Sequence, residues 1–365
     1  MDMNAILRNF KISGEPQEYQ PFGDGHINDT FLITLKNSPT RYILQRINHA
    51  IFLDVPGLMR NIQRVTDHIK QKLLRAGVEQ IERRVLQFIP TDSGQLFYQD
   101  TSGNYWRLCL YIPGSRSYNI IPDAQLAYKG GRAFGEFLYL LQDLPANELN
   151  VTIPNFHNLP FRLEQLKEAL HKNRAGRKTS AVQEIEAVID RTQKMNEIFS
   201  MSEQQTPLRV THNDTKFNNV LFDKDNNPLC VIDLDTVMPG RVFSDFGDAI
   251  RTGANTGAED DPQLERVSMN KAFYEAYTRG FLEKTRSILS DHEIESLAHG
   301  ALILTFMQAV RFLTDYLNGD TYYKIEHPLH NLQRTRAQLK LLKSMEESFE
   351  WMQQIVKKYA AQLSA

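Results

Sequence analysis

This chain is organised around three segments: Thr-His-Asn-Asp-Thr-Lys-Phe-Asn-Asn-Val-Leu-Phe (211–222), Cys-Val-Ile-Asp-Leu-Asp-Thr (230–236) and Ser-Asp-Phe-Gly-Asp-Ala-Ile-Arg (244–251). Two short apolar runs, 220–222 and 229–232, flank a series of turn-forming residues at 223–228. Such a pattern predicts a β-hairpin, because Asp, Asn and Pro favour the turn while Val, Ile and Phe favour the strands.

Polar side chains stand at both outer ends of this predicted hairpin. Pairing the strands brings Asp214, Asn219 and Asp233 to one edge. Carboxylate and amide oxygens suit Mg²⁺, which keeps several waters and takes its remaining ligands from phosphate. We therefore predict Asn219 and Asp233 as metal ligands, and Asp214 as the carboxylate that is free to accept a proton.

Protein kinases present the same groups in the same order, with a His-x-Asp-x-x-x-x-Asn loop and a metal-binding Asp after the next hairpin. His212, Asp214 and Asn219 occupy the three fixed positions of that loop. Lys216 stands two residues after the Asp, where kinases often place a cation that faces the transferred phosphate. We predict Asp214 and Lys216 as the catalytic pair.

Three neighbouring polar residues have supporting roles in this interpretation. His212 is expected to tether the loop by hydrogen bonds, and Asp245 to brace the same loop from behind. Asp235 lies two residues after Asp233. In an extended strand, such residues share one face. Asp235 is therefore expected to be a further metal or loop contact.

The sequences of these segments resemble those of the aminoglycoside phosphotransferase and choline kinase family, which are small-molecule kinases that share the protein-kinase fold. Three phrases carry the resemblance, at 212–221, 232–240 and 245–251, and it extends over nearly the whole chain. It implies an α+β, two-lobed protein-kinase-like fold, with a small antiparallel-sheet N-lobe and a larger, mainly helical C-lobe. We place the nucleotide-binding lobe at 1–112 and the catalytic and substrate-binding lobe at 113–365.

The resemblance also implies an activity. Within the family, the three phrases are most similar to members that phosphorylate the anomeric hydroxyl of N-acetylglucosamine or N-acetylgalactosamine, giving the sugar 1-phosphate. ATP would be the co-substrate and Mg²⁺ the metal. Two alternatives stay open: a kinase of another small alcohol, such as an aminoglycoside, choline or homoserine, and a nucleotide-binding regulator without catalysis.

Glycines near the start of the chain indicate a possible phosphate-binding loop. Gly23 and Gly25 precede a strand-like run at 31–35, and a second such run follows at 41–47. Backbone N–H groups of a glycine-rich loop can approach phosphates closely. We predict Gly23, Gly25 and Asn28 as nucleotide contacts, with a simple turn into a hairpin as the alternative.

The lysine that kinases carry on their third strand is missing here. Its expected position holds Gln45, followed by Arg46. Both are candidate nucleotide contacts, but alternation along a strand allows only one of them to face the nucleotide. The following helix-like run at 57–70 offers Asp67 and no Glu. We therefore expect another arrangement to replace the usual Lys–Glu ion pair.

Three more runs, 85–89, 95–98 and 105–111, have the composition of strands and would complete a five-stranded small lobe. Pro113 and Gly114 then break the pattern where kinases join their lobes. In that interpretation, the backbone of Leu110 and Ile112 contacts the adenine edge. The alternative is an ordinary strand end.

Most of the remaining chain has helical periodicity. We expect helices over 123–144, in two stretches between 161 and 199, and over 264–282, 291–317 and 330–359. Arg311 lies on an otherwise apolar helix. Burying an unpaired guanidinium is unfavourable, which indicates either a structural ion pair or a contact with substrate.

Composition limits the classes of partner. The chain has 365 residues, 41% of them hydrophobic, and a net charge of −2. This near-neutral balance argues against a general preference for nucleic acid or an anionic membrane. The two cysteines, Cys109 and Cys230, lie in apolar runs and are expected to be buried hydrophobes rather than a disulfide. We expect a cytoplasmic protein and predict no oligomeric state.

Overall fold

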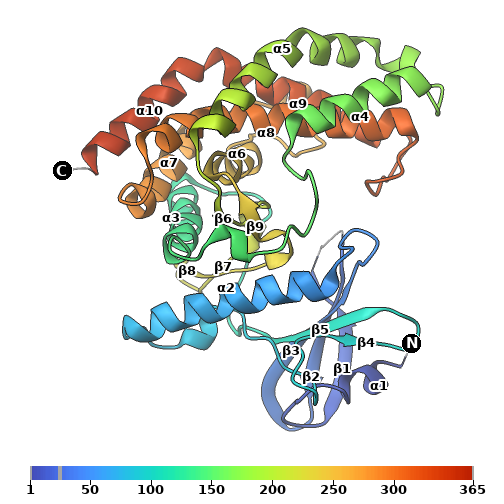
Figure 1. Cartoon of the computed structure of the whole chain (residues 1–365), viewed down its shortest axis with the longest axis vertical. Coiled ribbons are helices and arrows are strands. Elements are labelled where there is room, and N and C mark those ends of the chain that lie inside the picture. The colour runs from blue at the N-terminus through green and yellow to red at the C-terminus, as the bar shows by residue number, and fades with distance from the viewer. Residues whose placement is uncertain (1, 24–26, 364–365) are drawn as a thin grey trace.

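The computed structural model describes residues 2–23 and 27–363 and forms two lobes (Figure 1). The N-terminal part of the chain folds into an antiparallel sheet, and the C-terminal part is mainly helical. This arrangement confirms the predicted α+β, kinase-like fold. The boundary after Ile112 stays a prediction, although the last strand of the sheet ends two residues earlier, at Leu110.

The sheet of the N-lobe has five strands in the order β1-β2-β3-β5-β4. The strands are β1 (Pro16–Pro21), β2 (Asp29–Leu35), β3 (Ser38–Ile47), β4 (Tyr98–Gln99) and β5 (Tyr105–Leu110). All neighbouring pairs are antiparallel. A short helix, α1 (Met3–Leu7), packs with Trp106 and Leu108 of β5 in one apolar cluster.

The predicted number of strands is correct, but the strand predicted at 85–89 is wrong and the one predicted at 95–98 is displaced to Tyr98–Gln99. Residues 85–89 form no strand and contribute one isolated bridge, from Phe88 to Cys109. Of residues 95–98, only Tyr98 belongs to a strand. The fifth place is taken by β1, at the edge of the sheet. Five of its six residues are exposed, so it lacks the apolar–polar alternation by which a half-buried strand is detected.

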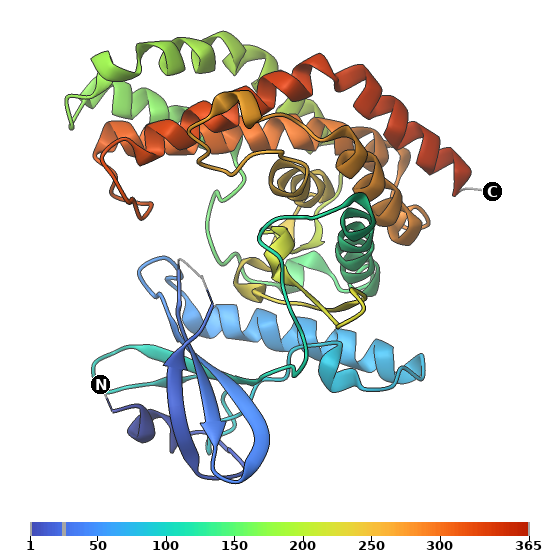
Figure 2. The same ribbon diagram turned by 180° about the vertical axis from the view of Figure 1, so that it is seen from behind.

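Helix α2 (Val55–Arg75) lies along the junction of the two lobes (Figures 1 and 2). Asp54 caps its N-terminus by accepting from Gly57 N at 2.9 Å. Leu58, Ile62, Val65 and Ile69 form its buried face, as their spacing predicts.

The fully buried Asn61 ties α2 to the C-lobe. Its amide donates to Asn150 O at 2.8 Å and to Val237 O at 3.0 Å. Because buried amides need such partners, these bonds fix the position of α2 relative to the segment that follows Asp233.

The C-lobe is built from eight helices in the described part of the chain: α3 (Ala124–Leu140), α4 (Leu159–Lys172), α5 (Val182–Gln205), α6 (Val242–Gly253), α7 (Lys271–Thr285), α8 (Asp291–Asn318), α9 (His330–Glu347) and α10 (Phe349–Gln362). The helix expected over 330–359 is therefore two helices that meet at Ser348. The helix expected from 264 begins only at Lys271, where Asn270 provides the N-cap.

Helix α8 forms the centre of this lobe. By length and composition it could cross a membrane, but 89% of its most apolar window is buried by other parts of the protein. The helix is apolar on most sides because α4, α5, α6, α9 and α10 all pack against it.

Helix α3 supports the catalytic segment through a glycine. A Cβ atom at Gly130 would lie 2.1 Å from the Phe217 ring, so only a glycine allows this approach. The contact seats the loop that contains Asp214 on the helical platform.

Candidate active site

The predicted hairpin forms as expected, with β7 (Val220–Phe222) antiparallel to β8 (Pro228–Val231). Ile232 N donates to Asn219 O at 2.9 Å just beyond the strands. This bond places Asn219 next to Asp233. Asp214 joins them, because the Asn219 amide donates to Asp214 O at 2.8 Å and to its carboxylate at 3.3 Å.

The predicted catalytic pair, Asp214 and Lys216, lies together. The Lys216 ammonium is 3.3 Å from the Asp214 carboxylate. Burial raises the pKa of Asp214, but Lys216 and His212 outweigh that effect, and the net shift is downward. The carboxylate is therefore ionised at neutral pH and able to accept a proton.

Buried hydrogen bonds hold the loop from behind. Asp245, in the first turn of α6, accepts from His212 N at 2.8 Å and Asn213 N at 2.7 Å. The His212 ring lies 2.9 Å from Ile232 O on the other side of the hairpin. Asn213 has a φ of +62°, and its amide donates to Thr236 O at 3.0 Å. The positions of His212 and Asp245 match their predicted supporting roles.

Asp233 occupies a left-handed turn with a φ of +60°. Loss of water and the nearby carboxylates of Asp235 and Asp214 raise the pKa of Asp233 to about 7. Asp233 is exposed to solvent, which moderates the effect of burial on its pKa. The proximity of several carboxylates is a reason to expect a cation at this point.

The donor set fits Mg²⁺. The Asn219 amide nitrogen is used by Asp214, which leaves its oxygen available, and Asp233 provides a carboxylate beside it. One amide and one carboxylate suffice for Mg²⁺ when phosphates and waters complete the octahedron.

The prediction for Asp235 is wrong in its geometry. Asp233 is left-handed and the chain then enters a 3₁₀ turn (η5, Leu234–Thr236), so the two carboxylates do not share the face of an extended strand. Asp235 points instead toward the N-lobe, where it pairs with Arg107 and accepts from Asn28 Nδ2 at 2.7 Å.

Among the three residues predicted in the phosphate loop, two are described. Gly23 has a φ of +74°, and apart from its chain neighbours no described residue lies within 4 Å of the place that a Cβ would occupy, which suits a close backbone approach to a ligand. Gly25 lies outside the described residues. Asn28 uses both ends of its amide within the protein, donating to Asp235 and accepting from Asn48 N at 3.0 Å.

The structure distinguishes between Gln45 and Arg46. Gln45 faces the junction of the lobes: its oxygen accepts from Arg107 Nε at 2.9 Å and its nitrogen donates to Thr30 at 3.1 Å. Arg46 points to the other face and pairs with Asp29 at a partly exposed position. The sequence reasoning missed Arg107, although it is a lone cation in the apolar run of β5, the same signal that singled out Arg311.

The predicted adenine-edge residues already have hydrogen-bond partners within the protein. Leu110 N donates to Gln87 O at 2.9 Å, and Ile112 O accepts from Ser115 at 2.7 Å. Tyr111 N donates to Arg41 O at 3.0 Å. These bonds remove Leu110 N and Tyr111 N as donors to a ligand. Nucleotide contact by other backbone groups of Leu110 and Ile112 stays a prediction.

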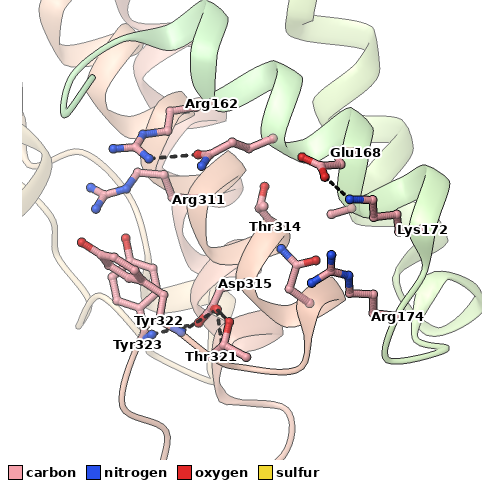
Figure 3. Close-up of a pocket in the computed structure, with 13 residues that line it drawn as sticks. Arg162, Glu168, Lys172, Arg174, Arg311, Thr314, Asp315, Thr321, Tyr322 and Tyr323 are labelled. Carbon is pink, nitrogen blue, oxygen red and sulfur yellow. Dashed lines mark hydrogen bonds and ion pairs between the residues drawn. The ribbon is translucent and has the colours of Figure 1, made fainter. Parts of the chain in front are cut away.

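Arg311 lines a cavity of about 310 Å³ between α4 and α8 (Figure 3). Its guanidinium donates to Gln308 at 3.0 Å and lies 5.2–5.8 Å from the ring centres of Phe156, Tyr322 and Tyr323. Within the described residues it forms no ion pair with a carboxylate. The structural ion pair, one of the two alternatives for Arg311, is not found there.

Two residues near Arg311 were not predicted individually. Figure 3 shows Arg162 with its guanidinium beside that of Arg311, and burial together with this second charge lowers the pKa of Arg162 to about 10. His157 has a buried Nδ1 without a partner among the described residues. Burial and Arg311 lower the pKa of His157 to about 3, while Asp214 opposes the shift. His157 therefore lies within the electrostatic reach of both Arg311 and Asp214.

A sequence comparison gives a match to the phosphotransferase enzyme family over residues 18–283. The match includes the hairpin, the supporting Asp245 and the N-terminal sheet from the third residue of β1 onward.

Solved structures share the fold at low identity. An aminoglycoside phosphotransferase from Alicyclobacillus acidocaldarius is 12% identical, with a TM-score of 0.63 over 98% of this chain and 97% of that chain. A choline kinase from Cryptosporidium parvum is 14% identical, with a TM-score of 0.60 over 98% of each chain. A spectinomycin phosphotransferase, solved with ADP and spectinomycin, is 13% identical, with a TM-score of 0.57 over 95% of this chain and 97% of that chain.

Proposed function

This chain belongs to the phosphotransferase enzyme family, and from that premise we propose that it is a Mg²⁺- and ATP-dependent kinase of N-acetylhexosamines. The acceptor is the anomeric hydroxyl of N-acetylglucosamine or N-acetylgalactosamine, and the product is the sugar 1-phosphate. The proposal for the acceptor rests on the wording of the segments at 212–221, 232–240 and 245–251.

One observation supports phosphoryl transfer above all others. The hairpin gathers Asp214, Asn219 and Asp233, so a proton acceptor stands beside a pair of oxygen ligands for Mg²⁺. Phosphoryl transfer asks little covalent chemistry of the protein and depends on position and charge.

In the proposed reaction, the acceptor oxygen forms a bond to the terminal phosphorus of ATP while the bridging P–O bond breaks and ADP leaves. Asp214 orients the acceptor hydroxyl and takes its proton. The Lys216 ammonium offsets negative charge on the transferred oxygens. Asn219 and Asp233 would hold Mg²⁺, which neutralises charge on the phosphates.

The acceptor is expected on the helical side of the hairpin. The charges of Asp214 and Arg311 both act on the pKa of the buried His157, and Arg311 lines the cavity between α4 and α8. The cavity is lined by hydrogen-bonding side chains and two tyrosine rings, a surface that suits a hydroxylated ligand. We propose Arg311 as a substrate contact on this ground.

A panel of acceptors with Mg²⁺ and ATP tests the proposal. We expect ADP release with N-acetylglucosamine or N-acetylgalactosamine, and a product whose phosphate is at the anomeric carbon by ³¹P and ¹H NMR. Turnover of choline, homoserine or an aminoglycoside, without turnover of the N-acetylhexosamines, would show that the proposed acceptor is wrong. The assignment of the chain as a kinase would still hold.

The regulator without catalysis is the second candidate, because the strand lysine is absent and Gln45 stands in its place. ATP binding without ADP release for any acceptor would favour it. The presence of Asp214, Asn219 and Asp233 in one cluster supports the kinase instead.

A further inference from the structure

The N-lobe lacks a lysine at the expected place on β3, yet a cation is present one strand away. Gln45 of β3 is the direct cross-strand partner of Arg107 on β5. Directly opposite residues of an antiparallel pair project from the same face of the sheet. Arg107 therefore projects from the face on which kinases carry the strand lysine.

The guanidinium of Arg107 is committed to protein partners. Its Nη1 pairs with Asp235, and its Nε donates to the Gln45 oxygen at 2.9 Å. The side chains of Arg107 and Asp235 are each only 3% exposed. Removing one member of a buried pair leaves the other charge uncompensated, which is strongly unfavourable.

This ion pair joins the two lobes at the turn that carries Asp233. Arg107 belongs to the N-terminal sheet, while Asp235 lies in η5, two residues after the predicted metal ligand. Asn28 of the N-lobe binds the other Asp235 oxygen at 2.7 Å. Asp235 is thus held from two separate N-lobe segments, and its turn cannot shift without breaking both contacts.

We propose that Arg107 is a positioning residue that takes the place of the strand lysine, holding the Asp233 turn against the sheet rather than binding the nucleotide phosphates. Gln45 is part of the device, because its amide fixes the guanidinium in the plane that reaches Asp235. This inference rests on the proposed kinase chemistry but not on the identity of the acceptor.

The test compares four variants with the wild-type chain. Arg107→Gln removes the cation, and Arg107→Met replaces it with an apolar side chain. Gln45→Lys with Arg107→Gln moves the positive charge to the neighbouring strand. Arg46→Gln is the matched control, since it removes an arginine of the same sheet whose ion pair is partly exposed.

The measurements are kcat and KM for ATP, the affinity for ADP with and without Mg²⁺, and the midpoint of thermal unfolding. We expect Arg107→Gln and Arg107→Met to lower kcat/KM for ATP about 100-fold, the size of loss that small misplacements of reacting groups produce. Affinity for ADP without Mg²⁺ should stay within about 3-fold, while the gain in affinity from Mg²⁺ is lost, because only the metal-ligand turn has moved.

The relocated charge separates positioning from packing. The double variant should recover at least about 10-fold of the lost kcat/KM, since a lysine at position 45 can reach Asp235 from the same face of the sheet. Arg107→Met, which restores bulk but no charge, should have a kcat/KM no higher than that of Arg107→Gln. A double variant no better than Arg107→Gln would overturn the proposal, as would a fall of more than about 10-fold in metal-free ADP affinity, the result expected of a direct phosphate ligand.

If Arg107→Gln does not fold, Arg107→Lys provides the same test. The ammonium keeps the charge for Asp235 but loses the fixed geometry of the guanidinium. We expect a loss of about 10-fold in kcat/KM with unchanged metal-free ADP binding, and a wild-type value would contradict the proposal. Failure of the wild-type chain to consume ATP would refute the proposed function. The ADP affinities with and without Mg²⁺ would still test whether Arg107 positions the Asp233 turn.

Discussion

The catalytic hairpin and the N-terminal sheet both present polar groups to the junction of the lobes, but they hold them by different contacts. In the hairpin, the loop with Asp214 is held by Asp245, which accepts from two consecutive backbone N–H groups. In the sheet, Arg107 is held by side chains, those of Gln45 and Asp235.

The difference shows how each region tolerates change. Backbone N–H groups are present whatever the side chain, so a brace such as Asp245 constrains only its own position and the spacing of the loop. A pair such as Arg107 and Asp235 needs two matching side chains on different lobes, and the charge can move to another strand if its partner remains within reach. The hairpin has the kinase pattern, and the sheet departs from it at Gln45.

The largest expected effect is in the hairpin. Asp214→Asn should lower kcat by about 1,000-fold, because the amide cannot accept the hydroxyl proton. Steady-state ADP release measures the loss of turnover, and ADP affinity measures nucleotide binding, which should be nearly unchanged. Near wild-type turnover by Asp214→Asn would show that the base is assigned wrongly.

The brace behind the loop should come next. Asp245→Ala removes the acceptor for His212 N and Asn213 N, and we expect kcat to fall about 100-fold as Asp214 loses its position. Asp245→Asn keeps one acceptor oxygen and should fall only about 10-fold. Wild-type activity of both variants would mean that the loop does not depend on this carboxylate.

Within the sheet, two adjacent residues of β3 sharpen the comparison. Gln45→Ala leaves Arg107 Nε buried without its acceptor, and we expect KM for ATP to rise about 10-fold. Arg46→Ala removes a partly exposed ion pair with Asp29 and should change KM by less than about 3-fold. A large rise in KM for ATP with Arg46→Ala and a small one with Gln45→Ala would place the nucleotide on the other face of the strand.

The acceptor side gives an effect of similar size on a different substrate. Arg311→Ala should raise KM for the acceptor sugar by about 10-fold and leave KM for ATP within about 2-fold, because Arg311 lines the cavity in which we propose that the acceptor binds. Lys167→Ala, on the exposed face of α4, is the matched control and should change neither value. A rise in KM for ATP alone would remove Arg311 from the acceptor site.

Stability should respond least to the outer ion pairs. Lys36→Ala breaks a pair with Glu15 in which both side chains are more than half exposed. Such pairs contribute about 0–1 kcal/mol to the free energy of unfolding, so the change by urea denaturation should stay below about 1 kcal/mol. A larger loss would show that this edge of the sheet is stabilised differently from the rest of the surface.

Much of the helical lobe and the hairpin was predictable from local patterns. Turn residues at 223–228 and the apolar runs beside them specify the hairpin, and the fixed spacing from His212 to Asn219 specifies the loop. The errors lie where neither face of an element is buried, as in β1, or where a backbone departs from regular geometry. Asp233 in its left-handed turn is the clearest case, because it redirects Asp235 away from the expected face.

The sequence by itself determined the order of catalytic groups, the absence of the strand lysine and the expectation that something replaces it, because these depend on spacing along one chain. Only the tertiary structure decided that the replacement is Arg107 and that its partner is Asp235, 128 positions away. The physical reason is that a buried charge is stabilised by the carboxylate that folding brings within hydrogen-bonding distance, and distance in space is not encoded by distance along the chain.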